Sequence, residues 1–475
     1  MSNMFSSDAT VTPSYCVVSC LWLIRCATAK GLLLPTAAVL QFTCLMPALT
    51  PSFAQLYRFC EYLNSKLDDA KLANKRIYYY SSTKADKRAN AVFLTAAWAM
   101  LYMGRTPEEA WEPFNGTLYP PLPPWHDATP TVCTYNLTVL DTLRGIAAAQ
   151  QLGAFKLDKF PIEEYEWWEQ PSNGDLSWIW HSKILAFAGP HNTRSSHDGY
   201  FTLTPEDYIP AFKKWGVKLV IRLNKKYYDE TRFTDAGIEH LDVYYLDGSN
   251  PPEHLLQRVI RAMEQCDGAI AIHCKAGLGR TGTCIACYMM KHHGWTAAEA
   301  IGWLRVARPG SVIGPQQHFL EDIQPRMARE GEEYRAAAAA AAKEARAAAA
   351  ASSSPLAAAG AAAMGGSAGR AAAGSPVIPG GGYSTSAAAS PASAFAGAAG
   401  ERVPGGGYPP ASSPGGMSVA SDASQGDHLR ASRVVRGSPG ASRLSSAAAA
   451  AGSSRSSGAT PSKSGLVRAL NEGGR

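Results

Sequence analysis

The chain has 475 residues, enough for two or three domains, and carries a formal net charge of +6 at neutral pH. Up to about residue 335 it mixes aromatic, aliphatic and charged residues, whereas the remainder is mostly Ala, Gly, Ser and Pro. A segment so poor in large apolar residues buries too little surface to offset the entropy of ordering it. The fold is therefore expected before residue 335, and the tail is expected to be solvated and disordered.

The cysteines are spread along the chain without paired framework spacing, which favours reduced thiols in a cytosolic or nuclear compartment. Cys284 and Cys287 form a C-x-x-C pair, but the apolar run around them predicts a buried helix rather than a redox or metal site. Before residue 50, two apolar runs are interrupted by Arg25 and Lys30, and neither forms a clean transmembrane span. We interpret residues 1–50 as divergent or wrongly predicted sequence, with a signal peptide or anchor as the alternative.

Apolar spacing and capping residues predict the elements in chain order. In the first part, helices are expected at 51–63, 89–103, 106–114 and 136–152, with a buried strand at 76–80 and a Pro-rich loop at 119–130. In the second part, strands are expected at 183–187, 218–222, 243–245 and 268–273, and helices at 205–215, 252–265, 280–292, 296–307 and 315–330. No strand is evident before Pro51, and the Ala-rich segment 332–351 is a candidate solvated helix. Strands alternating with helices predict an α/β fold, a central sheet with flanking helices.

An internal repeat relates the two parts. An apolar strand, a polar loop containing Arg, a long apolar helix and a Thr-capped helix begin at Ile77 and recur from Ala269, with a two-residue insertion. Ser82 then matches Cys274, and Arg88 matches Arg280. The repeat predicts two related domains in tandem, of which only the second has a complete site; chance resemblance of two strand–loop–helix units is the alternative.

The segment from Cys274 to Thr281 is a C-x5-R loop followed by Thr, between a buried strand and an apolar helix. Backbone N–H groups of such a loop converge on a phosphate, and its glycines permit close approach. Arg280 can grip two phosphate oxygens, and the positive field favours the nucleophilic thiolate of Cys274. Thr281 is expected to hydrogen-bond the thiolate, and the phosphate-binding residues are Lys275, Ala276, Gly277, Leu278, Gly279 and Arg280. The pattern predicts a cysteine-dependent phosphatase; a buried cysteine in a glycine-rich turn is the structural alternative.

Attack on a phosphoester requires a proton for the leaving oxygen. Asp247 lies just after the predicted strand 243–245, where Gly248 and two prolines indicate a shaped turn. We expect Asp247 to be the general acid; turn formation alone is one alternative, and Asp242, within or beside the strand, is a rival acid. No metal-ligand constellation is evident, and cysteine chemistry needs neither a metal nor another cofactor.

These features, together with residues 308–317, closely resemble the cell-division-cycle-fourteen family of mitotic-exit protein phosphatases over about residues 51–335. Further matching segments are 87–90, 133–138, 187–191, 221–226 and 232–237. The resemblance implies two tandem dual-specificity-phosphatase-like domains, the first inactive, in agreement with Ser82. The expected division is an inactive domain at 51–160, an acidic linker at 161–177, a catalytic domain at 178–335 and a low-complexity tail at 336–475.

The resemblance also implies a substrate, phosphoserine followed by proline and then a basic residue, besides phosphothreonine and phosphotyrosine. In the family an acidic groove near the domain linker binds that basic residue, and Glu166 and Glu169 match it best; a solvated acidic linker is the alternative. Gln316 or Gln317 is expected to orient the hydrolytic water. The implied partners are phosphorylated targets of proline-directed kinases, with no membrane and no required nucleic acid. The implied location is nucleus and cytoplasm, including centrosome or spindle by analogy.

Two other functions stay open at this point. A non-catalytic phosphopeptide-binding scaffold is disfavoured by the intact Cys274, Arg280 and Asp247. A phosphatase of lipid or RNA phosphates is disfavoured by the acidic linker and by Lys275 being the only basic loop residue besides Arg280. We also hypothesise that the tail is phosphorylated and is a substrate in cis, although composition alone could produce its Ser-Pro and Thr-Pro pairs at Ser354, Ser375, Ser390, Ser413, Ser438 and Thr460.

Overall fold

A computed structural model describes residues 15–18, 36–41, 50–73, 75–130, 132–197 and 200–352. The hypothesised phosphorylation sites of the tail, and most of the segment 1–50, lie outside these ranges. The described residues up to Ala338 belong to one compact unit, and the last turns of the helix ending at Ser352 belong to another. Among the described residues, no helix is long and apolar enough to cross a membrane.

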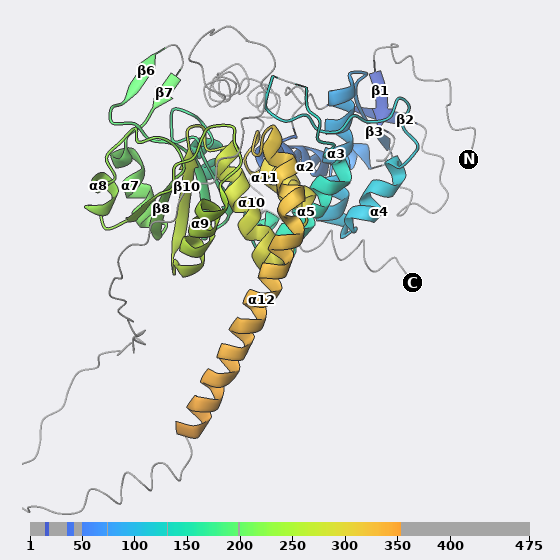
Figure 1. The fold of residues 1–475 in the computed structure, drawn as a ribbon. Coiled ribbons are helices and arrows are strands. Elements are labelled where there is room, and N and C mark those ends of the chain that lie inside the picture. Colours follow the sequence, from blue (N-terminus) through green and yellow to red (C-terminus); the bar gives the residue numbers. More distant parts are fainter. Residues whose placement is uncertain are drawn as a thin grey trace, which may run out of the picture. The chain divides into compact units, whose positions relative to one another are not determined.

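The first half of the compact unit combines a small sheet with several helices (Figure 1). Its strands have the order β1-β3-β2, with β1 (Tyr15–Val18) antiparallel and β2 (Thr36–Gln41) parallel to β3 (Lys75–Ser82). The expectation of no strand before Pro51 is therefore wrong, because β1 and β2 are short runs without the polar–apolar alternation that marks a strand. The helices are α2 (Phe53–Leu67), α3 (Ala85–Met103), α4 (Pro107–Trp111) and α5 (Val139–Gln151), with short 3-10 turns η1 (Ala70–Leu72), η2 (Glu112–Phe114) and η3 (Leu157–Lys159).

The second half contains a mixed five-stranded sheet of order β4-β5-β10-β8-β9. Only β4 (Leu176–Trp180) is antiparallel to its neighbour; β5 (Ile184–Ala188), β10 (Ala269–Cys274), β8 (Val217–Arg222) and β9 (Glu239–Asp242) are parallel. Core residues of α7 (Pro205–Lys214) and α8 (Thr231–Thr234) cover one face, and those of α9 (Glu253–Gln265), α10 (Gly279–His293) and α11 (Ala297–Ala307) cover the other. The carboxyl end of the central strand β10, where open α/β sheets bind ligands, therefore carries Cys274.

Most predicted elements are present, but the strand predicted at 243–245 is wrong. The strand of this region is β9, which ends at Asp242 and lies half exposed at the sheet edge, so it lacks an apolar pattern. Val243 and Tyr245 follow the strand and are buried in the core, so their large apolar side chains reflect burial rather than a strand. Five further helices and strands were not predicted, because they are short: β4, α6 (Ile162–Trp168) inside the expected linker, α8, and the hairpin of β6 (Ser195–His197) and β7 (Tyr200–Thr202).

The predicted internal repeat is present in the backbone. Gly104 ends α3 and Gly294 ends α10 in the same left-handed conformation, with φ of 67° and 68°. Capping boxes at Thr106 and Thr296 then start α4 and α11. Ser82 and Arg88 have the same spacing as Cys274 and Arg280, whereas Thr106 lies 18 positions after Arg88 and Thr296 lies 16 positions after Arg280, so the two-residue insertion lies between the arginine and the capping threonine of the first copy.

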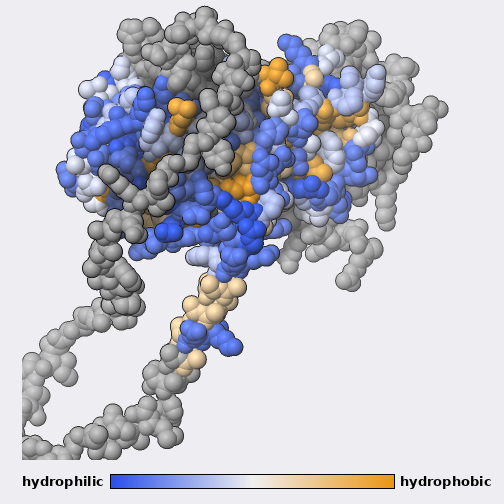
Figure 2. All heavy atoms as spheres, viewed as in Figure 1, coloured by the Kyte–Doolittle hydropathy of each residue, from blue (hydrophilic) through white to orange (hydrophobic). Residues whose placement is uncertain are grey.

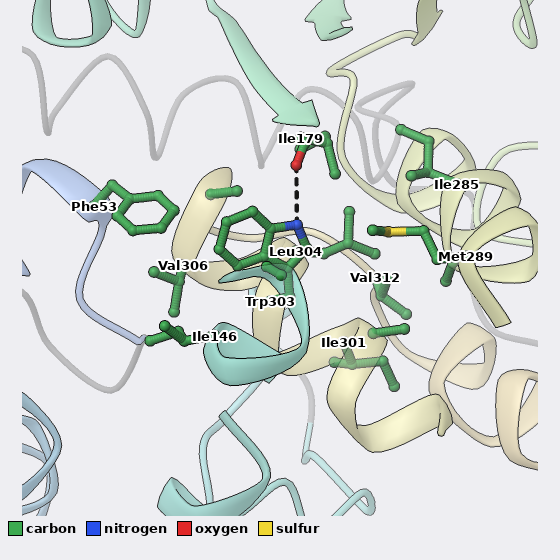
Figure 3. Close-up of a cluster of buried hydrophobic side chains, with 14 of the residues drawn as sticks. Phe53, Ile146, Ile179, Ile285, Met289, Ile301, Trp303, Leu304, Val306 and Val312 are labelled. Carbon is green, nitrogen blue, oxygen red and sulfur yellow. Dashed lines mark hydrogen bonds between the residues drawn. The ribbon is translucent and has the colours of Figure 1, made fainter. Parts of the chain in front are cut away.

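The two halves share one hydrophobic core (Figure 3). Helices α5 and α11 pack so closely that a Cβ atom on Gly145 would lie 2.4 Å from the carbonyl oxygen of Glu299. Trp303 of α11 contacts Phe53 of the first half, with 5.1 Å between ring centroids, and its Nε1 donates to the carbonyl of Ile179 at 3.0 Å. The first half therefore supports the second through buried packing rather than through a solvated boundary.

Helix α12 runs from Pro315 to Ser352, so the segments predicted at 315–330 and 332–351 form one continuous helix. Its beginning buries Leu320 and Met327 in the shared core. Its alanine-rich residues 336–347 are exposed, and this part of the helix shows pale orange in Figure 2. High alanine content is sufficient for a helix to continue beyond its packed turns, because alanine has the highest intrinsic helix propensity.

Candidate active site

Cys274 is the last residue of β10, and only 3% of its surface is exposed. The loop that follows has the strand–loop–helix geometry predicted for phosphate binding. Gly277 adopts a φ of +66°, and a Cβ atom there would lie 2.0 Å from the carbonyl oxygen of Phe187. Both the left-handed backbone and the close approach require glycine at this position. The other predicted phosphate-binding residues, except the half-buried Lys275, are buried in the same loop: Ala276, Leu278, Gly279 and Arg280.

Arg308 binds the backbone of this loop, a role that the sequence analysis missed. Its guanidinium is fully buried and donates to the carbonyl oxygens of Gly277 at 2.7 Å and Ala276 at 3.0 Å. The same guanidinium donates to the hydroxyl of Ser177 at 3.3 Å and to the carboxylate of Asp175 at 3.0 Å. The carboxylate of Asp175 compensates the positive charge of Arg308. Since a trans peptide directs its N–H opposite to its carbonyl, the N–H groups following Ala276 and Gly277 point away from Arg308. The signal in the sequence was an arginine next to a glycine turn, which is too common to be specific.

Arg280 connects the loop to the candidate general acid. Its Nη1 donates to the carbonyls of Leu223 at 3.2 Å and Tyr245 at 2.9 Å, and its Nη2 lies 3.0 Å from Oδ1 of Asp247. Its Nε is buried without a hydrogen-bond partner among the described residues. The rival acid Asp242 instead binds Arg222 at the sheet edge, with 2.6 Å between Oδ2 and Nη2. The structure thus brings Asp247, and not Asp242, to the guanidinium next to Cys274.

His273 supports the loop through a chain of hydrogen bonds. Its Nδ1 lies 3.0 Å from the carbonyl oxygen of Cys274 and must donate, so Nε2 accepts from the hydroxyl of Tyr228 at 2.8 Å. The Tyr228 hydroxyl is in turn 2.8 Å from Nε2 of His240. Burial lowers the pKa of His273 well below its usual value. A neutral His273 with a fixed tautomer holds the end of β10 rather than exchanging protons in the reaction.

Two further residue predictions concern side chains of α10. Thr281 is buried, and its hydroxyl has no hydrogen-bond partner among the described residues, so the expected bond to the thiolate stays a prediction. Cys284 and Cys287 are fully buried free thiols, which confirms core packing for the C-x-x-C pair. Burial raises the pKa of Cys284 to about 12. Within the described ranges, no cluster of His, Cys, Asp and Glu could hold a metal ion.

Gln316 and Gln317 lie at the start of α12 but face different partners. Gln316 accepts from the backbone N–H of Ile313 at 3.2 Å and donates to the carbonyl of Ser249 at 3.2 Å. Its Oε1 would lie 2.9 Å from a Cβ atom on Gly279, so this side chain borders the phosphate loop. Gln317 instead donates to the carboxylate of Asp127 in the first half at 3.0 Å. Of the two, only Gln316 contacts both the phosphate loop and the loop that carries Asp247.

The acidic residues expected to bind a basic substrate residue lie at α6. Glu169 caps the end of this helix. Glu166 forms a bidentate ion pair with Arg58 of α2, at 2.8 and 3.0 Å, and this interaction raises the pKa of the arginine. Both partners are more than a third exposed, so the pair is accessible to solvent. The sequence could not show this pairing, because the two residues lie in different predicted elements.

The comparisons with known proteins agree with this architecture. The profile of the family described as "Dual specificity protein phosphatase, N-terminal half" matches residues 51–149, and that of "Polymorphic toxin system, DSP-PTPase phosphatase" matches residues 199–294. The dual specificity protein phosphatase CDC14A of Homo sapiens is 49% identical over 285 residues, which cover 60% of this chain and 48% of that protein. Over these residues the chain is similar to the CDC14 family of dual specificity phosphatases.

The similarity also extends to a yeast protein. The tyrosine-protein phosphatase CDC14 of Saccharomyces cerevisiae is 35% identical over 280 residues, covering 57% of this chain and 50% of that protein. Among solved structures, PTPMT1 is 21% identical with a TM-score of 0.28, covering 33% of this chain and 99% of that one, a similarity too low to bear on function. The chain spans about half the length of the first two CDC14 relatives named here.

Proposed function

We propose that this chain is a protein phosphatase that hydrolyses phosphoserine, phosphothreonine and phosphotyrosine through a phosphocysteine intermediate. The observation that carries the proposal is the 3.0 Å contact between Arg280 and Asp247 beside a C-x5-R loop that begins at Cys274. Similarity to the CDC14 family supports it. A phosphate clamp and a proton donor at one nucleophile are the components that a two-step phosphoryl transfer requires.

In the first step, the thiolate of Cys274 attacks phosphorus as the bond from phosphorus to the leaving oxygen breaks. Loop N–H groups and Arg280 bind the phosphoryl oxygens, where charge develops in the transition state. Asp247 donates a proton to the leaving oxygen, and Thr281 hydrogen-bonds the sulfur. In the second step, a water molecule that gives its proton to Asp247 attacks phosphorus, the sulfur–phosphorus bond breaks, and inorganic phosphate leaves. Gln316 is the better-placed candidate for orienting that water.

The proposed substrates are proteins phosphorylated by proline-directed kinases, at phosphoserine-Pro sites followed by a basic residue. The acidic helix α6 supports this preference, since Glu166 and Glu169 there can attract a lysine or arginine. The same acidic helix would repel a lipid or RNA phosphate. By analogy with the family, we further propose action at mitotic exit, in nucleus and cytoplasm and at centrosome or spindle.

The deciding assay uses a phosphoserine-Pro-x-Lys peptide and the same peptide with Pro→Ala. Wild-type protein is expected to release phosphate from the first peptide faster than from the second, and Cys274→Ser is expected to release none. A folded wild type that hydrolyses neither peptide would contradict the proposed activity and favour the non-catalytic phosphopeptide-binding scaffold. Turnover by Cys274→Ser equal to that of wild type would remove the proposed nucleophile.

A further inference from the structure

The first half, in which Ser82 stands at the position matched to Cys274, reaches the other half through Asp127. This carboxylate is 3% exposed and has every oxygen occupied. Oδ1 accepts from the N–H of Thr129 at 3.1 Å and from its hydroxyl at 2.6 Å. Oδ2 accepts from the N–H of Gly314 at 2.6 Å and from Nε2 of Gln317 at 3.0 Å. Asp127 therefore binds the loop of residues 311–317, which belongs to the other half.

The charge of Asp127 is matched across the same boundary by Arg305. Arg305 is 1% exposed and donates to Oε1 of Gln317 at 2.6 Å, so Gln317 bridges the two charges. Burial lowers the pKa of Arg305, and the negative charge of Asp127 opposes this effect. Arg305 also donates to the carbonyls of Ser311 at 3.1 Å and Val312 at 2.9 Å. The loop 311–317 is thus held from one side by Arg305 and from the other by Asp127.

This loop needs such support because its backbone is strained. Val312 has a φ of +58°, a left-handed conformation that a β-branched residue adopts rarely. Its neighbour Ile313 packs against Ala276 and Leu278 of the phosphate loop. Gln316 then connects the loop to the carbonyl of Ser249, two positions after Asp247. A shift of the loop 311–317 would therefore displace both the phosphate loop and the loop that carries Asp247.

We propose that Asp127 is a positioning residue for catalysis, which holds the loop 311–317 so that Gln316 keeps the Asp247 loop next to Arg280. This inference rests on the proposed function. It gives the first half a direct part in the reaction. Loss of Asp127 should slow protonation of the leaving oxygen, because the loop 311–317 and Gln316 connect Asp127 to Asp247.

The test is Asp127→Asn, assayed on an alkyl phosphate (a phosphoserine peptide) and on p-nitrophenyl phosphate. Asparagine keeps the shape but directs an NH2 group at N–H or O–H donors, so the loop loses hydrogen bonds on one side. Since small misplacements of catalytic groups are costly, we expect kcat to fall roughly tenfold on the peptide and about twofold on the aryl phosphate. KM is expected to change little on either substrate.

The control is Trp98→Phe, which removes the buried hydrogen bond to Asn64 in the first half, away from the loop 311–317. It should lower the melting temperature without changing the ratio of the two activities. If Asp127→Asn does not fold, Thr129→Val removes one hydrogen bond to the same carboxylate and should shift the ratio in the same direction. Equal losses on both substrates, or no loss, in the folded variant would overturn the inference. A wild type inactive on both substrates would instead overturn the proposed function on which it rests.

Discussion

The carboxylate of Asp247 faces the guanidinium of Arg280, with 3.0 Å between Oδ1 and Nη2. Arg280 is 3% exposed in its side chain, whereas Asp247 is 28% exposed. Asp247 thus lies closer to the protein surface than Arg280 does. A phosphate held by the arginine would place its leaving oxygen on the side of Asp247, which leads to the first prediction.

Replacing Asp247 with Ala should slow alkyl phosphates far more than aryl phosphates. An alkoxide requires a proton to leave, while a phenolate leaves with little help, and general acid catalysis contributes roughly 10²–10⁴-fold. Steady-state kinetics on a phosphoserine peptide and on p-nitrophenyl phosphate measure the difference. The matched control is Asp242→Asn, which removes the ion pair to Arg222 and should slow both substrates alike. Equal losses for Asp247→Ala on the two substrates would point to another acid.

The phosphocysteine intermediate should be visible in wild-type protein. Acid quenching during turnover is expected to leave phosphate on the peptide that contains Cys274, because the thiophosphate bond forms before water attacks. Mass spectrometry of the digested protein checks the site. Cys284→Ala is the control, since that thiol is fully buried and burial raises its pKa to about 12. Phosphate on any other residue, with Cys274 unmodified, would contradict the mechanism.

Gly277→Ala should disable the loop, whereas Gly294→Ala should not. Both glycines have positive φ, of 66° and 68°, so alanine strains the backbone by about 1 kcal/mol or more at either position. Only at Gly277 does the new Cβ also meet a backbone atom, the carbonyl oxygen of Phe187, at 2.0 Å; at Gly294 nothing lies within 4 Å. Inhibition by inorganic phosphate and kcat report on the loop. A Gly277→Ala variant with unchanged phosphate inhibition would show that the loop tolerates the shift.

Removing Arg58 should sharpen the preference for a basic substrate residue. Arg58 already neutralises Glu166 through two hydrogen bonds, and Arg58→Met frees the carboxylate while keeping a similar side-chain length. Because exposed ion pairs are worth about 0.2–1 kcal/mol, the ratio of kcat/KM between Lys-containing and Ala-containing peptides should rise less than about fivefold. Glu166→Gln should lower the same ratio. If neither variant changes it, Glu166 has no part in recognition.

Acid should destabilise the fold partly through His293. Its side chain is half-buried with Nε2 inaccessible to solvent, and this burial lowers its pKa to about 4, against about 6.5 in an unfolded chain. Below pH 6.5 the unfolded chain binds a proton that the folded protein does not, so this stability is complete above pH 6.5 and declines toward pH 4. His293→Phe keeps the ring beside Trp180 and should reduce the fall in melting temperature over that interval by roughly 2–4 °C. Parallel melting curves for variant and wild type would contradict the assignment.

Most of the chemistry was predictable from the sequence because it is local. The proposed nucleophile, its arginine and the glycines of the loop lie within seven consecutive residues, and strand and helix patterns on either side set their backbone. The capped helices of the repeat are local for the same reason. The rival acids Asp242 and Asp247 could not be separated in this way, since only tertiary contacts distinguish them: Asp242 pairs with Arg222 across neighbouring strands, and Asp247 contacts Arg280.

The sequence by itself determined the α/β fold class and the family resemblance, and it predicted the nucleophile and the phosphate loop, since these depend on short-range pattern. Only the tertiary structure decided which distant residues hold the site in place. Arg308 binds the loop carbonyls, Arg58 occupies Glu166, and Asp127 crosses from the first half to the loop 311–317. Each of these contacts joins segments far apart in the chain, where a single charged residue carries no periodic signal.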